Sequence, residues 1–226
     1  MDAKFNRMPT AKKLQIVHLL SGDLWAGAES QTCALLRALA TNDRYDLLVV
    51  LLNPGKLHDE LMAAGVSVAL IDESKLSFWQ IRHQLRQLLA ERHVDLIHAH
   101  RYKENTLAVL SRSVCGRPKL VQTVHGLNHP GSGVAGLRMR IYGLLNWALS
   151  RFSFDAIVAV SSDIAEVLSR RGLAGKVCTL RNGIDPLALD QLKPDLTLRQ
   201  ELGVAQSDLL VGVCGRFVPV KRYDLF

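Results

Sequence analysis

The chain has 226 residues, of which 48% are apolar and 22% are charged, and its formal net charge at pH 7 is +7. Its longest aliphatic run, residues 47–52, is six residues long, whereas a bilayer span requires roughly 20. The positive charge suits phosphorylated substrates, an anionic membrane surface or nucleic acid. Because the basic residues are scattered and match no nucleic-acid-binding motif, we expect no nucleic-acid partner.

The cysteines and the start of the chain indicate a reducing compartment. The cysteines lie far apart without a C-x-x-C pair, which favours free thiols and argues against a disulfide framework or a zinc site; they are Cys33, Cys115, Cys178 and Cys214. Residues 1–13 form a polar, basic tail that lacks the apolar segment of a signal peptide. We therefore expect a cytoplasmic protein, with the inner face of the membrane as a peripheral location.

The first predicted strand covers residues 14–20, a continuous apolar run that carries His18. Such a run is typical of a strand buried on both faces. A glycine-bracketed loop, residues 21–27, leads into a predicted helix at 28–40. The start of a helix can bind an anion, but the spacing matches neither a P-loop nor G-x-G-x-x-G. An ordinary strand-to-helix turn is the favoured interpretation.

Strands and helices alternate along the next 150 or so residues. Apolar runs predict further strands at 46–52, 66–71, 94–100, 119–124, 155–160 and 176–180. Helical spacing predicts helices between them at 58–64, 78–92, 105–115 and 137–152. This regular alternation predicts an α/β fold with a doubly wound, parallel, Rossmann-like sheet.

Histidines mark the ends of two successive predicted strands. His98 and His100 close the run at 94–100, and His125 follows the run at 119–124. Because the carboxyl ends of parallel strands line the ligand crevice, we expect these imidazoles at one rim of the sheet. His98 and His100 resemble a chelating pair, but without a third ligand they predict no metal site.

The helix predicted at 137–152 is amphipathic and follows a loop rich in glycine and proline. A helix that covers the core is the favoured interpretation, and contact with a membrane surface is the alternative. The next helix is expected to be capped at residues 161–163, where Asp163 and Glu166 have capping-box spacing.

The pattern changes after residue 186. Residues 187–207 form a polar connector with one predicted helix after Thr197, residues 209–214 predict a strand, and 215–221 form a glycine turn with two cations. We therefore divide the chain into a tail (1–13), a Rossmann-like domain (14–186), a connector (187–207) and the truncated start of a second domain (208–226).

Six short stretches together make the chain resemble the amino-terminal half of a family 4 glycosyltransferase, a retaining enzyme with two facing Rossmann-like domains (GT-B). They occur in the family's order: 27–29 (GAE), 95–100 (DLIHAH), 123–126 (TVHG), 159–162 (AVSS), 182–185 (NGID) and 215–221 (GRFVPVK). The absent glycine fingerprint argues against an epimerase-like nucleotide-binding protein.

The resemblance implies a role for each matching residue. His125 would lie nearest the reacting sugar as the catalytic residue. Arg216 and Lys221 would bind the donor diphosphate. The acceptor and the cleft would be bordered by Gly27, Ala28, Glu29, His100, Gly126, Asn128 and Ser161, and an interdomain hinge would include Asn182, Gly183 and Asp185. No metal or other cofactor is implied.

The implied function is transfer of a sugar from a UDP- or GDP-sugar to a glycan or lipid-linked acceptor. Cell-surface polysaccharide, lipopolysaccharide or glycolipid assembly is the expected context. Because most of the donor domain is missing from the 226 residues, we expect the isolated chain to be inactive. The alternative is a non-catalytic fragment that binds an acceptor or a partner, and a partner chain could then supply the donor site.

Overall fold

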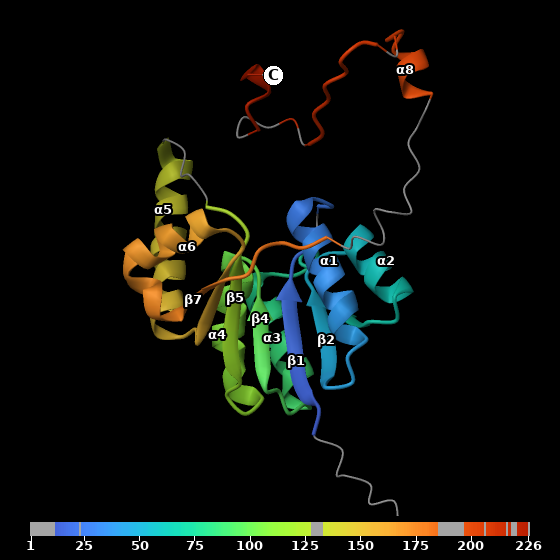
Figure 1. Cartoon of the computed structure of the whole chain (residues 1–226). Coiled ribbons are helices and arrows are strands. Elements are labelled where there is room, and N and C mark those ends of the chain that lie inside the picture. Colours follow the sequence, from blue (N-terminus) through green and yellow to red (C-terminus); the bar gives the residue numbers. More distant parts are fainter. Residues whose placement is uncertain are drawn as a thin grey trace, which may run out of the picture. The chain divides into compact units, whose positions relative to one another are not determined.

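The computed structural model describes residues 12–22, 24–127, 133–184, 197–205, 207–215, 217 and 221–225. The chain divides into two compact units, Met1–Ile184 and Asp185–Phe226. The first unit contains the sheet and the helices that cover it (Figure 1). None of the described helices is both long enough and apolar enough to cross a membrane.

The described part of the first unit forms a seven-stranded sheet in the order β3-β2-β1-β4-β5-β6-β7, and all of its pairings are parallel. This confirms the predicted doubly wound sheet. The strands are β1 (Leu14–Leu20), β2 (Tyr45–Leu51), β3 (Ser67–Leu70), β4 (Leu96–Ala99), β5 (Lys119–Val124), β6 (Ala156–Ala159) and β7 (Val177–Thr179).

Helices cover both faces of this sheet (Figure 1). The described helices of the first unit are α1 (Gly27–Ala40), α2 (Lys56–Ala63), α3 (Phe78–Ala90), α4 (Tyr102–Ser111), α5 (Gly133–Phe152) and α6 (Ser162–Leu168). Short helical turns follow at η1 (Arg112–Val114), η2 (Ser169–Leu173) and η3 (Ala174–Lys176).

Two buried clusters explain the apolar runs of the strands. In β2, Leu48 and Val50 pack with side chains of α3 and α4. Leu47, Val49 and Leu51 pack with side chains of α1 and α2. Successive residues of a strand point to opposite faces, so β2 is buried on both sides, as expected for a parallel strand between helices.

The apolar face of α5 departs from the predicted core-covering helix. Leu137, Ile141 and Leu144 are 60%, 56% and 68% exposed. The helix instead meets its neighbours through polar residues, because Asn105 Nδ2 donates to Asn146 Oδ1 over 2.7 Å and Gln122 Nε2 donates to Ser150 Oγ over 2.6 Å. The prediction of a core-covering apolar face is therefore wrong for most of this helix.

Lys176 was predicted to open the seventh strand, but β7 begins one residue later. Its ammonium group donates to the backbone carbonyls of Arg151 and Phe154 over 2.7 and 2.6 Å. A cation at this position satisfies carbonyl groups at the end of α5 and interacts favourably with the helix dipole.

The second unit contains two short helical segments among its described residues, α8 (Leu198–Glu201) and η5 (Tyr223–Leu225). The strand predicted at 209–214 is not formed, and Leu209 is 90% exposed. A strand requires a neighbour for its backbone groups, and none of the described residues pairs with this segment.

Candidate functional site

Four histidines meet at the carboxyl ends of three adjacent strands. His18 lies in β1 opposite His98 of β4 in the parallel register. His100 follows β4 and His125 follows β5. The structure thus confirms that His98, His100 and His125 share one rim, and it adds His18. The sequence showed His18 within a strand, but did not reveal that this strand pairs with β4.

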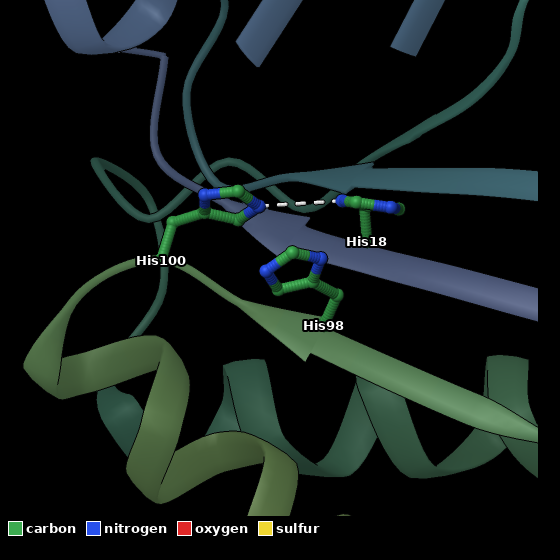
Figure 2. Close-up of side chains that lie close together, drawn as sticks. All are labelled: His18, His98 and His100. Atoms are coloured by element: carbon green, nitrogen blue, oxygen red, sulfur yellow. Dashed lines mark hydrogen bonds between the residues drawn. The ribbon is translucent and has the colours of Figure 1, made fainter. Parts of the chain in front are cut away.

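Three of these imidazoles form a hydrogen-bonded chain. His18 Nδ1 lies 3.2 Å from His100 Nε2, and His100 Nδ1 lies 3.0 Å from His125 Nε2. His98 lies beside the first of these hydrogen bonds (Figure 2), and its Nε2 is 2.8 Å from Thr123 Oγ1. A neutral imidazole has one N–H and one lone pair, so all hydrogen bonds in the chain run in the same direction. The tautomer of His18 therefore sets the tautomer of His125.

Burial keeps these rings uncharged. It lowers the pKa of His18 and His100 well below the ordinary value, and it lowers the pKa of His98 to about 4, with nearby histidines adding to each shift. The pKa of His125 is lowered by burial, raised by Glu29 and lowered by Arg101. The site therefore presents neutral imidazoles, which can donate or accept a hydrogen bond near neutral pH.

The distances among His18, His98 and His100 would allow a metal ion, because one nitrogen of each lies within 4.8 Å of the others. His18 supplies the third imidazole, which the sequence pattern did not place beside His98 and His100. However, the rings of His98 and His100 are stacked, with centroids 4.5 Å apart and planes inclined by 19°. Imidazole lone pairs lie in the ring plane, so stacked rings do not direct them to one point. This arrangement favours hydrogen bonding over metal binding.

An ion pair lies beside the histidine chain. Glu29, in the first turn of α1, is only 4% exposed and pairs with the guanidinium group of Arg101. Its other carboxylate oxygen accepts a hydrogen bond from the backbone N–H of Ala26 over 3.2 Å. Of the predicted cleft residues on α1, Gly27 is exposed and Ala28 is half-buried. Arg101 could not be recognised from the sequence, because its partner lies 72 residues away.

A buried carboxyl group was also missed by sequence reasoning. Glu104 of α4 is fully buried, and one of its oxygens accepts a hydrogen bond from the hydroxyl of Ser21, just after β1. Its other oxygen has no hydrogen-bond partner among the described residues. Nδ1 of His125 is likewise buried without such a partner. Two buried polar atoms, one on His125 and one on Glu104, thus have unused hydrogen-bonding capacity.

One predicted cleft residue, Ser161, also serves the fold. Ser161 is the N-cap of α6 and accepts a hydrogen bond from the backbone N–H of Ile164 over 3.3 Å. The capping box predicted at Asp163 and Glu166 is therefore wrong, because Ser161 occupies the cap and Glu166 pairs with Arg170.

The remaining predictions are only partly covered by the structure. Gly126 is exposed directly after His125, and both Asn182 and Gly183 are exposed after β7. Lys221 is exposed in the second unit. Asn128, Asp185 and Arg216 lie outside the described residues.

A parallel sheet with polar residues at its carboxyl edge defines a Rossmann-like ligand-binding domain. Residues 25–186 match the sequence model of Glycosyltransferase Family 4. The chain therefore belongs to this family, and its fold is that of the amino-terminal half of a GT-B glycosyltransferase. No curated protein matches the sequence significantly.

Solved structures with the same fold are distant in sequence. HepE of Anabaena, crystallised with UDP-glucose, is 23% identical with a TM-score of 0.66, and the match covers 85% of this chain and 50% of HepE. A glycosyltransferase of Rickettsia africae ESF-5 is 17% identical with a TM-score of 0.62, over 86% and 51% of the two chains. The lipopolysaccharide outer core galactosyltransferase WaaB is 14% identical with a TM-score of 0.55, over 76% and 46%. The chain thus spans about half the length of these proteins.

Proposed function

We propose that this chain is the acceptor-side part of a retaining glycosyltransferase that moves a sugar from a nucleotide sugar to an acceptor. The observation that carries this proposal is the hydrogen-bonded chain His18–His100–His125 at the carboxyl edge of a family 4 domain. The UDP-glucose complex of HepE supports a UDP-sugar as donor, and a GDP-sugar is the alternative.

In this proposal, His125 binds the donor sugar beside the bond that breaks. One ring nitrogen is fixed by His100, and the other is free to donate to, or accept from, a sugar hydroxyl. The bond between the anomeric carbon and the diphosphate breaks, and its electron pair leaves with the phosphate. The acceptor hydroxyl forms the new bond and gives its proton to an oxygen of the leaving diphosphate. Arg216 and Lys221 would stabilise the charge of the leaving diphosphate.

The proposed acceptor is a glycan or a lipid-linked molecule used in cell-surface polysaccharide, lipopolysaccharide or glycolipid assembly. Peripheral contact with an anionic membrane at its inner face is part of this proposal. The exposed leucines and the arginines of α5 support it, since apolar and cationic side chains favour such surfaces.

A non-catalytic fragment that binds an acceptor or a partner is the second candidate. The described residues of the second unit form no strand. On this alternative, the histidine site would bind a ligand without sugar transfer.

The test compares this chain with a longer polypeptide that adds a complete donor-binding domain, each incubated with UDP- and GDP-sugars and candidate acceptors. We expect transfer only by the longer polypeptide, with the anomeric configuration retained in NMR spectra of the product. In that polypeptide, His125→Asn should lower kcat by about 100-fold or more, whereas His83→Asn, at an exposed histidine of α3, should not. Absence of transfer and of donor hydrolysis with every donor would refute the proposal, and turnover by this chain alone would refute its dependence on a donor domain.

A further inference from the structure

A pocket of about 580 Å³ opens between α4, α5 and η2, outside the histidine site. Its described lining residues are apolar, aromatic or cationic: Tyr102, Met139, Arg140, Gly143, Leu144, Trp147 and Arg171. Trp147 Nε1 donates to the backbone carbonyl of Arg171 over 3.0 Å. This hydrogen bond joins α5 to η2 and fixes two walls of the pocket.

The two arginines of the pocket have no carboxylate partner among the described residues. Arg140 and Arg171 are both exposed, whereas the neighbouring Arg170 pairs with Glu166 over 2.5 Å. Neither α5 nor η2 contains an acidic residue. Two free guanidinium groups on one pocket are complementary to a phosphate or diphosphate, which they bind through charge-assisted hydrogen bonds.

Apolar side chains extend from the pocket along α5. Leu144 lines the pocket and is 68% exposed, and Leu137 and Ile141 continue the exposed surface on the preceding turns of the same helix. Residues three or four apart lie on one face of a helix, so these side chains form one apolar strip. A ligand that uses both features carries a phosphate at one end and an apolar chain at the other.

The pocket also lies close to the histidine site along the chain. Tyr102, one of its lining residues, is the first residue of α4 and follows His100 by two positions. An acceptor whose phosphate binds in the pocket could therefore extend its sugar or hydroxyl end toward the carboxyl edge of the sheet.

From these observations we infer that the pocket binds the phosphate of a lipid-linked acceptor, with Arg140 and Arg171 on the phosphate and the apolar strip of α5 against the lipid chain. This inference rests on the proposed glycosyltransferase function and names its acceptor class. It assigns the exposed face of α5 to lipid, and not to a second copy of the chain.

The test measures binding of the purified 226-residue chain to vesicles by co-sedimentation, without any nucleotide sugar. Three vesicles are compared: phosphatidylcholine alone, phosphatidylcholine with a polyisoprenyl phosphate, and phosphatidylcholine with phosphatidylglycerol at the same surface charge. We expect the polyisoprenyl phosphate vesicles to bind most tightly. Inorganic phosphate should compete only weakly, because it lacks the apolar chain.

Matched variants assign this binding to the pocket. Arg140→Gln and Arg171→Gln should each weaken binding to polyisoprenyl phosphate vesicles about fivefold, and Leu144→Ser should weaken binding as well. Arg170→Gln and Met62→Ser, an exposed arginine outside the pocket and an exposed apolar residue on α2, should not. Thermal unfolding of each variant checks that the fold is kept.

Three outcomes would overturn the inference. Binding to phosphatidylglycerol vesicles as tight as to polyisoprenyl phosphate vesicles would show general attraction to anionic membranes. If Arg170→Gln weakened binding as much as Arg140→Gln and Arg171→Gln do, binding would not depend on the pocket. A dimer that Leu144→Ser dissociates would assign the face to a second copy of the chain. The binding assay contains no donor sugar, so its result does not depend on whether sugar transfer is ever detected. Transfer to a soluble acceptor without vesicle binding would refute the lipid inference and leave the proposed glycosyltransferase function intact.

Discussion

His98 couples the stability of the fold to pH. Its folded-state pKa is about 4, whereas an unperturbed histidine has a pKa near 6.5. Between these values the unfolded chain binds more protons than the folded one. The contribution of neutral His98 to the free energy of unfolding is therefore fully present above pH 6.5 and is lost as pH falls toward 4. Between pH 7 and pH 5, protonation of His98 alone should lower the free energy of unfolding by at most about 2 kcal/mol, which corresponds to a fall in Tm of up to about 8 °C.

Calorimetry between pH 7 and pH 5 measures this loss. His98→Gln should flatten the dependence of Tm on pH, whatever its effect on Tm at pH 7. His83, an exposed histidine, provides the control, since His83→Gln should leave the slope unchanged. A wild-type Tm that stays constant over this range would contradict the burial of uncharged imidazoles.

Glu29 and Arg101 act on His125 in opposite directions. The carboxylate raises the pKa of His125 and the guanidinium group lowers it. Glu29→Gln should therefore lower the pKa of His125 further, and Arg101→Gln should raise it. NMR titration of the imidazole signals measures both shifts. Shifts of the same sign in the two variants would show that the change comes from altered packing and not from charge.

Among the secondary-structure elements, α6 depends on one hydroxyl group at its start. Ser161 accepts the backbone N–H of Ile164. Ser161→Ala should lower the free energy of unfolding by about 1 kcal/mol, because a backbone donor loses its partner, whereas Ser161→Asp should retain most of the stability. Denaturant unfolding measures both. An unchanged midpoint in Ser161→Ala would show that this hydrogen bond contributes little to stability.

The outcome for α5 shows what helical periodicity can and cannot predict. Residues such as Leu137 and Ile141 recur at helical spacing, so the existence of an apolar face was predictable from the sequence. The surroundings of that face were not predictable. The opposite side of α5 is held through Asn146 and Ser150, and their partners Asn105 and Gln122 belong to other elements. Helical periodicity predicts that a helix has an apolar face, but it does not predict what packs against that face.

The same limit applies to the site. His100 and His125 could be brought together from the sequence, since His100 ends one predicted strand, His125 directly follows the next, and successive parallel strands end at one edge. His18 could not, because its neighbour His100 is 82 residues away and the pairing of β1 with β4 is a property of strand order. The pair of Glu29 and Arg101 was hidden for the same reason.

At the scale of the whole molecule, the two units should differ in stability. β1 is paired on both sides, with β2 and with β4, whereas residues 209–214 are exposed and form no strand. Hydrogen exchange should be at least about a thousandfold slower in β1 than at 209–214, because opening β1 requires unfolding of the sheet. Comparable protection of both segments in a monodisperse, monomeric sample would contradict this expectation.

The position of β1 between β2 and β4 also bears on how the protein is made. The strand that pairs with one edge of β1 ends at Leu51, and the strand for its other edge begins at Leu96. A ribosome that adds about 5–20 residues per second needs several seconds for the chain between them. During that time the nascent chain presents β1 with an unpaired edge, to which another chain or a chaperone can bind. β1, an interior strand of the finished sheet, is thus an edge strand during synthesis.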